Sequence, residues 1–358
     1  MRMSAKPLTI VIFGATGDLF QRKLAGALFD LGQKELLPEH TEIIGFSRKM
    51  LSHDQFRAFI QNALAARSSG KIVEPDAFVS RAFYHQGDLY DAESYASLGK
   101  FLEERDKTNG VCSDKLFHLA VPPDLYETVF TRLSASGLAI PCAPGLPDEK
   151  QAWTRVLVEK PFGNNQKEAA RLDRLLGKLF EEDQIFRIDH YLAKEAVQNI
   201  LTFRFSNGLF EPLWNRKHIE KVEIRFLKHE DISTRGSFYD GVGALRDVGQ
   251  NHILQMLALV TMENPGSMEA RGIREARRKI LEKVTGGGRE IGSWVTRGQY
   301  EGYKNEQGVR HDSQTETYFK ITARIENNRW RGVPFLLESG KALAESRVSI
   351  AVYFKPSF

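Results

Sequence analysis

The chain has 358 residues, which is long for one compact core and predicts two domains. Apolar residues make up 42% and charged residues 27%, and the formal net charge is +4, so the composition excludes an intrinsically disordered protein. The small charge also argues against nucleic acid as a partner. The apolar run 8–13 is too short for a signal-peptide core or a membrane span, so we expect no membrane association and a cytoplasmic location.

In the first half, strands and helices alternate. The continuous apolar run Leu8–Phe13 predicts a strand that is buried on both faces of a parallel sheet, and 42–47 predicts a second one. Ser52 and Gln55 form the pattern of a capping box that opens a helix to about residue 66. Further strands are expected at 115–120 and 155–158, and helices at 18–37, 91–104 and 124–133. This alternation predicts an α/β fold with a Rossmann-type, doubly wound parallel sheet in residues 1–185.

The second half has a different pattern. Residues 217–226, 318–325 and 347–354 alternate apolar with polar positions, as strands with one face in water do. Helices are expected at 244–262 and at 271–284, followed by a glycine loop at 286–288. Residues 186–358 therefore predict an α+β domain with a large, open, mainly antiparallel sheet.

Two smaller features receive a structural interpretation. A basic cluster with helical spacing is read as a solvated helix face; it consists of Arg271, Arg274, Arg277, Arg278 and Lys279. The two cysteines, Cys112 and Cys142, show neither a metal-ligand spacing nor a disulfide-rich context, so a reducing cytoplasm fits and no metal site is predicted.

A glycine turn follows the first strand directly. It reads Gly14-Ala-Thr16-Gly17-Asp18-Leu19 and resembles a dinucleotide turn, in which Gly14 permits the tight turn and Gly17 lets a pyrophosphate approach the helix N-terminus. The full G-x-G-x-x-G pattern is absent, because the turn has only two glycines. A plain strand-to-helix turn therefore stays an alternative at this point.

The end of the second strand bears on cofactor choice. An NAD-binding sheet usually carries an acidic residue there for the ribose 2′-hydroxyl, whereas this chain has Ser47-Arg48-Lys49. Arg48 could bind a 2′-phosphate through paired hydrogen bonds, with Ser47 or Lys49 assisting. The residues favour NADP; NAD is left open, as is the reading of both cations as surface charges.

The segment Arg187-Ile-Asp-His-Tyr-Leu-Ala-Lys-Glu195 concentrates polar side chains where a short apolar run passes into a helix. His190, Tyr191 and Lys194 are donors suited to a phosphate dianion. Asp189 can orient an imidazole. A second group, Asp247 and Asn251 with His252, lies on one predicted helix, and a histidine oriented by a carboxylate is a common base near neutral pH.

Several ordered motifs together resemble the glucose-6-phosphate dehydrogenase family along nearly the whole chain. They are the glycine turn, Glu159-Lys-Pro-Phe-Gly163, the segment 187–195, Phe210-Glu-Pro-Leu-Trp-Asn215, Arg235-Gly-Ser-Phe-Tyr-Asp240, Ala244-Leu-Arg-Asp247, Gln250-Asn-His252, Gly332-Val-Pro-Phe335 and Gly340-Lys341.

The resemblance implies oxidation of β-D-glucose 6-phosphate at C1 to 6-phosphoglucono-δ-lactone with NADP. It implies that His252 is the general base and Asp189 its orienting partner. The sugar phosphate would be bound by His190, Tyr191, Lys194, Asp247 and Lys341, with Glu230 as the candidate substrate-contacting glutamate, although its spacing is shifted. Lys160 would bridge cofactor and sugar.

Members of that family usually continue well past residue 358, so a naturally short protein and a fragment are both left open, and a homodimer is left open with them. Two other functions also remain. One is another NAD(P)-dependent sugar oxidoreductase of the glucose–fructose oxidoreductase-like class. The other is a non-catalytic paralogue or partner subunit that binds sugar phosphate.

Overall fold

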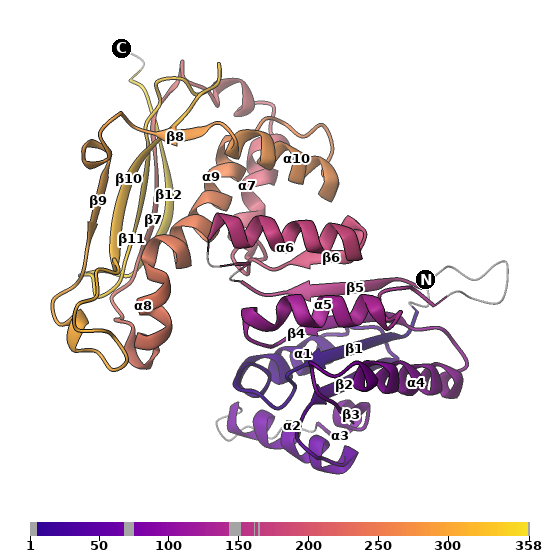
Figure 1. The fold of residues 1–358 in the computed structure, drawn as a ribbon. Helices are drawn as coiled ribbons and strands as arrows, with labels where there is room; N and C mark the ends of the chain where they lie inside the picture. Colours follow the sequence, from indigo (N-terminus) through magenta and orange to yellow (C-terminus); the bar gives the residue numbers. More distant parts are fainter. Residues whose placement is uncertain (1–5, 68–74, 143–151, 161, 164, 357–358) are drawn as a thin grey trace. The chain divides into compact units, whose positions relative to one another are not determined.

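The computed structural model describes residues 6–67, 75–142, 152–160, 162–163 and 165–356 (Figure 1). Pro161 of the Glu-Lys-Pro segment lies outside these residues. The chain divides into two compact units, Met1–Ile188 and Asp189–Phe358. The division falls beyond the predicted boundary at residue 185, because Ile185–Arg187 pairs with the preceding strand of the first unit.

Unit 1 contains a six-stranded sheet in which every pair of neighbours is parallel, in the order β3-β2-β1-β4-β5-β6. This order and the intervening helices give the predicted Rossmann-type fold. The strands are β1 (Leu8–Phe13), β2 (Thr41–Ser47), β3 (Ala82–Gln86), β4 (Asp114–Leu119), β5 (Thr154–Val158) and β6 (Ile185–Arg187).

Both faces of this sheet are covered, which explains the continuous apolar strands. Ile10 and Ile12 of β1 point into one core, whereas Val11 and Phe13 point into the other. Successive side chains of a strand alternate between faces, so a strand with a helix layer on each side buries a residue at every position, most of them apolar. All six residues of β1 are buried accordingly.

The helical segments of unit 1 are η1 (Phe20–Leu24), α1 (Ala25–Gln33), α2 (His53–Arg67), α3 (Asp76–Val79), α4 (Ala92–Asn109), η2 (Pro123–Leu125), α5 (Tyr126–Ala135), α6 (Gln166–Leu179) and η3 (Glu182–Gln184). The capping box before α2 is confirmed: the N–H of Ser52 donates to Gln55 Oε1 at 2.8 Å, and the N–H of Gln55 donates to Ser52 Oγ at 3.2 Å. The helix predicted at 18–37 ends at Gln33 and contains a π-helical stretch, η1, close to its start.

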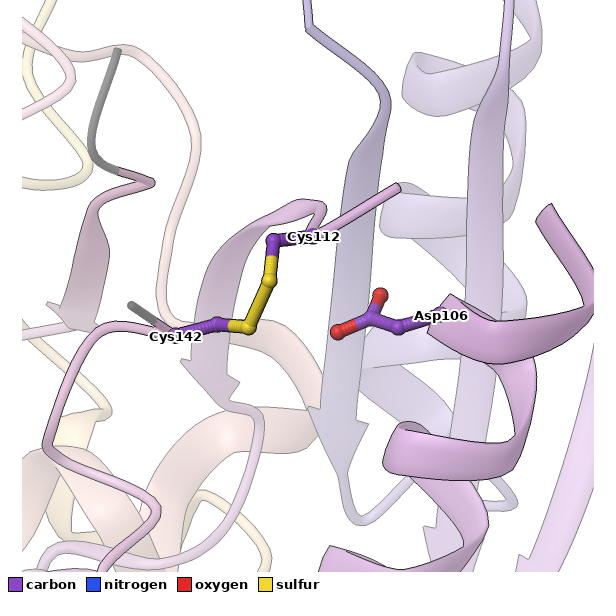
Figure 2. Close-up of side chains that lie close together, drawn as sticks. All are labelled: Asp106, Cys112 and Cys142. Atoms are coloured by element: carbon purple, nitrogen blue, oxygen red, sulfur yellow. A yellow bond between two sulfur atoms is a disulfide. The ribbon is translucent and has the colours of Figure 1, made fainter. Parts of the chain in front are cut away.

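A disulfide joins Cys112 to Cys142, with the two Cα atoms 5.9 Å apart (Figure 2). It connects the start of β4 to the segment that follows α5, and Figure 2 shows the Asp106 carboxylate beside it. That carboxylate accepts hydrogen bonds from Ser113 Oγ at 2.6 Å and from Lys115 Nζ at 2.6 Å. The pairing departs from the reducing environment suggested by the sequence, since two isolated cysteines carry no disulfide pattern and only the fold brings them together.

Unit 2 contains a mixed sheet in the order β12-β7-β11-β10-β8, with β9 also paired to β10. Only β7 and β11 are parallel among the described pairs, so the predicted mainly antiparallel sheet is confirmed. The strands are β7 (Ile219–Leu227), β8 (Val284–Gly286), β9 (Val295–Gly298), β10 (Tyr318–Ile325), β11 (Phe335–Gly340) and β12 (Arg347–Phe354).

The helical segments of unit 2 are α7 (Glu195–Phe205), η4 (Glu211–Leu213), η5 (Ser233–Arg235), α8 (Gly236–Ala244), η6 (Leu245–Ile253), α9 (Leu254–Thr261), α10 (Ala270–Leu281), η7 (Ile291–Ser293) and η8 (Tyr303–Asn305). Two expectations were wrong. The helix at 244–262 is π-helical in its first part, and the helix expected to reach residue 284 ends at Leu281, because Val284 begins β8. Among the described residues, no helix is long and apolar enough to cross a bilayer.

Candidate active site

A carboxylate–imidazole pair lies inside unit 2. Asp189 Oδ1 is 2.6 Å from His252 Nδ1, and the same oxygen accepts the N–H of Tyr191 at 3.0 Å. His252 is only 3% exposed. The sequence predicted both residues but could not show that they touch, because 63 positions separate them.

His252 lies on the π-helix η6 together with Asp247. A π-helix joins residue i to residue i+5, so Asp247 and His252 are placed one turn apart on the same side of the segment, a relation that an α-helix would not give them. The segment begins at a kink, where Gly243 has φ +78°. Glu316 stabilises this start: its Oε1 accepts the N–H of Leu245 at 3.0 Å, and its carbonyl accepts the N–H of Ala244 at 2.9 Å.

Aromatic rings and a lysine surround the pair. The ring centroid of His252 is 4.3 Å from that of Tyr191 and 4.7 Å from that of His190. Lys194, which precedes α7, places its Nζ 3.8 Å from the centre of the Tyr191 ring. His190 and Lys194 are exposed, so both can meet a solute. Burial raises the pKa of Tyr191, which keeps its phenol protonated as a donor.

Atoms of Asp189, His190 and His252 that could bind a metal lie within 4.8 Å of one another. Oδ1 of Asp189 is already bonded to His252 and to the Tyr191 amide. The arrangement therefore suits proton transfer: the carboxylate fixes the imidazole tautomer in which Nδ1 carries a hydrogen, and Nε2 can act as a base.

Charged groups gather around Lys341, another predicted residue. Burial lowers the pKa of Lys341 below its usual value. The carboxylates of Asp247 and Glu230 act to raise that pKa, whereas the cations Arg235 and Lys228 lower it further. Lys341 thus belongs to the same electrostatic cluster as Asp247 and Glu230. It also lines a cavity of about 630 Å³ beside β10 and β11.

Lys228 was missed by sequence reasoning, although it directly follows β7, whose strand period was visible. Its charge also lowers the pKa of Tyr191, so it lies close enough to act on the group around His252. An excess of cations near an imidazole base is the arrangement expected for a dianionic substrate.

Arg277 corrects the interpretation of the basic cluster on α10. Four of its members are exposed, but Arg277 is half-buried and donates a hydrogen bond from Nη2 to Gln255 Oε1. Its charge interacts with Asp189. The signal was present in the sequence, since Arg277 follows Ile273 by four positions and precedes Ile280 by three, on the apolar stripe of the helix.

In unit 1, the glycine turn lies at the carboxyl end of β1. Gly14 has φ +83°, and a Cβ there would lie 2.4 Å from the carbonyl oxygen of Ala120, so no other residue fits. The N–H of Gly17 donates to the carbonyl of Gly14 at 2.9 Å, which closes the turn. The glycines thus allow a tight turn directly before a helix N-terminus, the arrangement that fits the phosphates of a dinucleotide. Asp18 and Leu19 begin that turn.

The other predicted cofactor residues also belong to unit 1. Thr16 Oγ1 is 2.9 Å from Ser47 Oγ, so the turn is joined to the end of β2. Arg48 and Lys49 are exposed there, and none of the three residues Ser47, Arg48 and Lys49 carries a carboxylate. Lys160 follows β5 and is partly buried. These residues fit a 2′-phosphate better than a ribose 2′-hydroxyl.

Comparisons with known proteins agree over nearly the whole chain. The model of the "Glucose-6-phosphate dehydrogenase, NAD binding domain" matches residues 11–199, and that of the "Glucose-6-phosphate dehydrogenase, C-terminal domain" matches residues 201–358. A glucose-6-phosphate 1-dehydrogenase of Chlamydia muridarum is 39% identical over 98% of this chain and 70% of its own.

Two solved structures are similar as well. A glucose-6-phosphate dehydrogenase in complex with glucose 6-phosphate matches with a TM-score of 0.87 and 35% identity, over 99% of this chain and 73% of its own. The glucose-6-phosphate 1-dehydrogenase from Mycobacterium avium matches with a TM-score of 0.85 and 33% identity, over 99% of this chain and 74% of its own. The chain therefore belongs to the glucose-6-phosphate dehydrogenase family.

Proposed function

We propose that this protein is an NADP-dependent glucose-6-phosphate 1-dehydrogenase. It oxidises β-D-glucose 6-phosphate at C1 to 6-phosphoglucono-δ-lactone, the first step of the oxidative pentose phosphate pathway, in the cytoplasm. The observation that carries the proposal is the hydrogen bond of 2.6 Å between Asp189 and His252 within a cluster of cations. The names of the relatives support the same activity.

The dinucleotide is assigned to unit 1, and the sugar phosphate is assigned mainly to unit 2. Gly14, Thr16, Gly17, Asp18 and Leu19 form the pyrophosphate site, in which the two glycines shape the turn and the N–H groups at the start of the following helix donate. Arg48 holds the 2′-phosphate. When bound, the nicotinamide supplies the acceptor for the hydride that leaves C1.

His252 acts as the general base. With Nδ1 held by Asp189, its Nε2 takes the proton of the C1 hydroxyl while the hydride leaves the same carbon. Asp189 then stabilises the imidazolium that forms, since a neighbouring carboxylate favours the charged imidazole. The pair thus removes the proton without placing a free charge in a buried position.

The remaining residues bind the substrate. His190, Tyr191 and Lys194 hold the 6-phosphate through a cation and hydrogen-bond donors. Asp247, Glu230 and Lys341 hold sugar hydroxyls, since carboxylates accept their hydrogens and the lysine donates to their oxygens. Lys160 bridges the cofactor and the sugar, which completes the set of binding residues.

The test is turnover of the purified 358-residue chain with glucose 6-phosphate and NADP, followed as NADPH absorbance. His252→Asn should lower kcat by about a thousandfold or more, because it removes the base. Binding of glucose 6-phosphate, measured by calorimetry, should change little. His311→Asn, a replacement of an exposed histidine of unit 2, serves as the control and should retain activity.

Three outcomes would contradict the proposal. A well-folded wild-type protein that binds glucose 6-phosphate without forming NADPH would indicate the non-catalytic paralogue. Equal rates with glucose and with glucose 6-phosphate would favour another sugar oxidoreductase. Normal turnover of the His252→Asn variant would refute the assignment of the base.

A further inference from the structure

The loop after β2, Ser47–Lys49, is held by the neighbouring strand β3. The hydroxyl of Tyr84 lies 3.1 Å from the carbonyl oxygen of Ser47 and 2.5 Å from that of Lys49. The N–H of Gly87 donates to the Ser47 carbonyl as well, at 3.0 Å. Backbone on either side of Arg48 is therefore fixed, and Tyr84 is the one side chain among the described residues that bonds both carbonyls.

A chain of hydroxyl groups links this loop to the glycine turn. Thr16 Oγ1 lies 2.9 Å from Ser47 Oγ, which lies 2.8 Å from the hydroxyl of Tyr84. A carbonyl can only accept, so the single proton of Tyr84 is donated to the loop carbonyls, with Lys49 the nearer. Ser47 must then donate to Tyr84, and Thr16 to Ser47.

The direction of these hydrogen bonds limits which groups can donate to the cofactor. A phosphate oxygen needs donors, but the hydroxyl protons of Thr16 and Ser47 are both used within the chain. The Ser47 hydroxyl is therefore not a donor to a 2′-phosphate, in contrast to its predicted assisting role. The exposed cations of Arg48 and Lys49 are the groups that this loop presents.

We infer that Tyr84 is a positioning residue for cofactor discrimination: its hydroxyl holds the Ser47–Lys49 backbone in the one conformation from which Arg48 and Lys49 bind the 2′-phosphate. The inference rests on the proposed use of NADP. Tyr84 is 4% exposed and its ring packs on Phe56 with centroids 5.3 Å apart, so the hydroxyl can be removed without removing the packing.

The experiment compares two ligands that differ only in the 2′-phosphate, 2′,5′-ADP and 5′-AMP, bound to the full chain by calorimetry. Tyr84→Phe should weaken 2′,5′-ADP by about fivefold to tenfold, because the loop carbonyls lose a buried donor and the loop gains alternative conformations. The affinity for 5′-AMP should change less than about twofold. The ratio of KM for NADP to KM for NAD should rise in parallel.

Tyr95→Phe is the matched control. Tyr95 is also buried in unit 1, but its hydroxyl donates to the carbonyl of Leu89 at 3.1 Å and does not bond the loop. Removal of the Tyr95 hydroxyl should leave the ratio of the affinities for 2′,5′-ADP and 5′-AMP unchanged. Ser47→Ala is a second variant, which breaks the link to Thr16 but keeps the bond from Tyr84 to Lys49, and its loss of 2′,5′-ADP affinity should be smaller than that of Tyr84→Phe.

The outcomes separate the two proposals. If the wild type binds 2′,5′-ADP no better than 5′-AMP, the preference for NADP fails and the inference fails with it. The inference alone is overturned if the wild type prefers 2′,5′-ADP and Tyr84→Phe keeps the same preference. It is also overturned if Tyr84→Phe weakens the binding of 2′,5′-ADP and of 5′-AMP by the same factor. A larger loss in Ser47→Ala than in Tyr84→Phe would show direct contact of Ser47 with the phosphate and would overturn it too.

Discussion

At the scale of single residues, the charge state of Asp189 decides whether His252 can act as a base. Burial raises the pKa of Asp189, but the hydrogen bond and charge of His252, the N–H of Tyr191 and the charge of His190 outweigh it, so the pKa lies below its usual value. The carboxylate is ionised throughout the neutral range. Its contribution to stability is therefore present above about pH 4 and is lost as the pH falls below that.

The charge of Arg277 also interacts with Asp189. Burial lowers the pKa of Arg277, whereas the charge of Asp189 raises it and that of Arg274 lowers it. Because the two charges attract, the Arg277 cation favours the ionised form of Asp189, which orients His252. Several other charged or titratable groups act on the pair or on its neighbours: His190, Tyr191, Lys194, Lys228, Asp247 and Lys341.

Removing the Arg277 charge should therefore move the acid limb of the kcat/KM profile to higher pH. We expect Arg277→Gln to shift that limb by about half a pH unit, and the shift should shrink at high salt. Arg277→Lys keeps the charge and should keep the wild-type profile. Arg278→Gln is the control, because Arg278 is exposed and paired with Glu275 and Glu282 on the same helix. If Arg277→Gln and Arg278→Gln shift the acid limb equally, the effect is not specific to the interaction of Arg277 with the Asp189–His252 pair, and the prediction is contradicted.

At the scale of elements, local rules predicted some boundaries to the residue. The bounds of β1 follow from a continuous apolar run that ends in Gly14, and the start of α2 follows from the Ser52–Gln55 capping box. The short strands β8 and β9 were missed, because they hold glycine at their ends and exist only through their pairing with β10. A short strand that forms only because it pairs with a strand distant in sequence carries no strand pattern in its own residues.

The π-helix η6 is the clearest case of a feature that the sequence could not supply. The apolar positions of 244–262 fit a regular helix, and the residue that fixes the start of η6, Glu316, lies 71 positions away from Leu245. The same holds for the contact between Asp189 and His252. The sequence predicted Asp189 and His252 as site residues, whereas the backbone register that brings them together depends on tertiary hydrogen bonds.

Gly243 tests the importance of that kink. A Cβ at this position would lie 2.5 Å from Glu316 Oε1, and its φ of +78° strains any other residue. Gly243→Ala should lower the free energy of unfolding by about 2 kcal/mol and reduce kcat, because the start of η6 is displaced. The melting temperature and kcat should be measured together.

The matched control is Gly241→Ala in the same helix, where a Cβ would meet nothing within 4 Å. That change should be neutral or stabilise by about 0.5–1 kcal/mol, as alanine does in a helix. Equal destabilisation by both substitutions would mean that the helix, and not the kink, is sensitive.

At the scale of the whole molecule, the two units have separate hydrophobic cores. Two core clusters belong to unit 1 and one to unit 2, and none of their buried members is shared. Units with their own cores can unfold in separate transitions, so a single melting temperature need not describe the chain. The disulfide provides a way to separate them, because Cys112 and Cys142 both belong to unit 1.

Reduction of the disulfide should destabilise unit 1 alone. The bond closes a loop with a sequence separation of 30, which corresponds to about 3–4 kcal/mol in the chain-entropy account. Calorimetry with and without dithiothreitol should show one transition moving to lower temperature and the other unchanged. Because the chain has only two cysteines, a thiol titration should count none before reduction and two after it.

The double variant Cys112→Ser/Cys142→Ser is the control: it should melt like the reduced protein and should not respond to dithiothreitol. A cytoplasm keeps thiols reduced, so the proposed location would leave unit 1 in this less stable form in the cell. Apart from Lys160, the residues proposed to bind glucose 6-phosphate belong to unit 2, so its affinity should change little between the two redox states. A loss of that affinity on reduction, at a temperature where both forms are folded, would contradict the separate roles proposed for the two units.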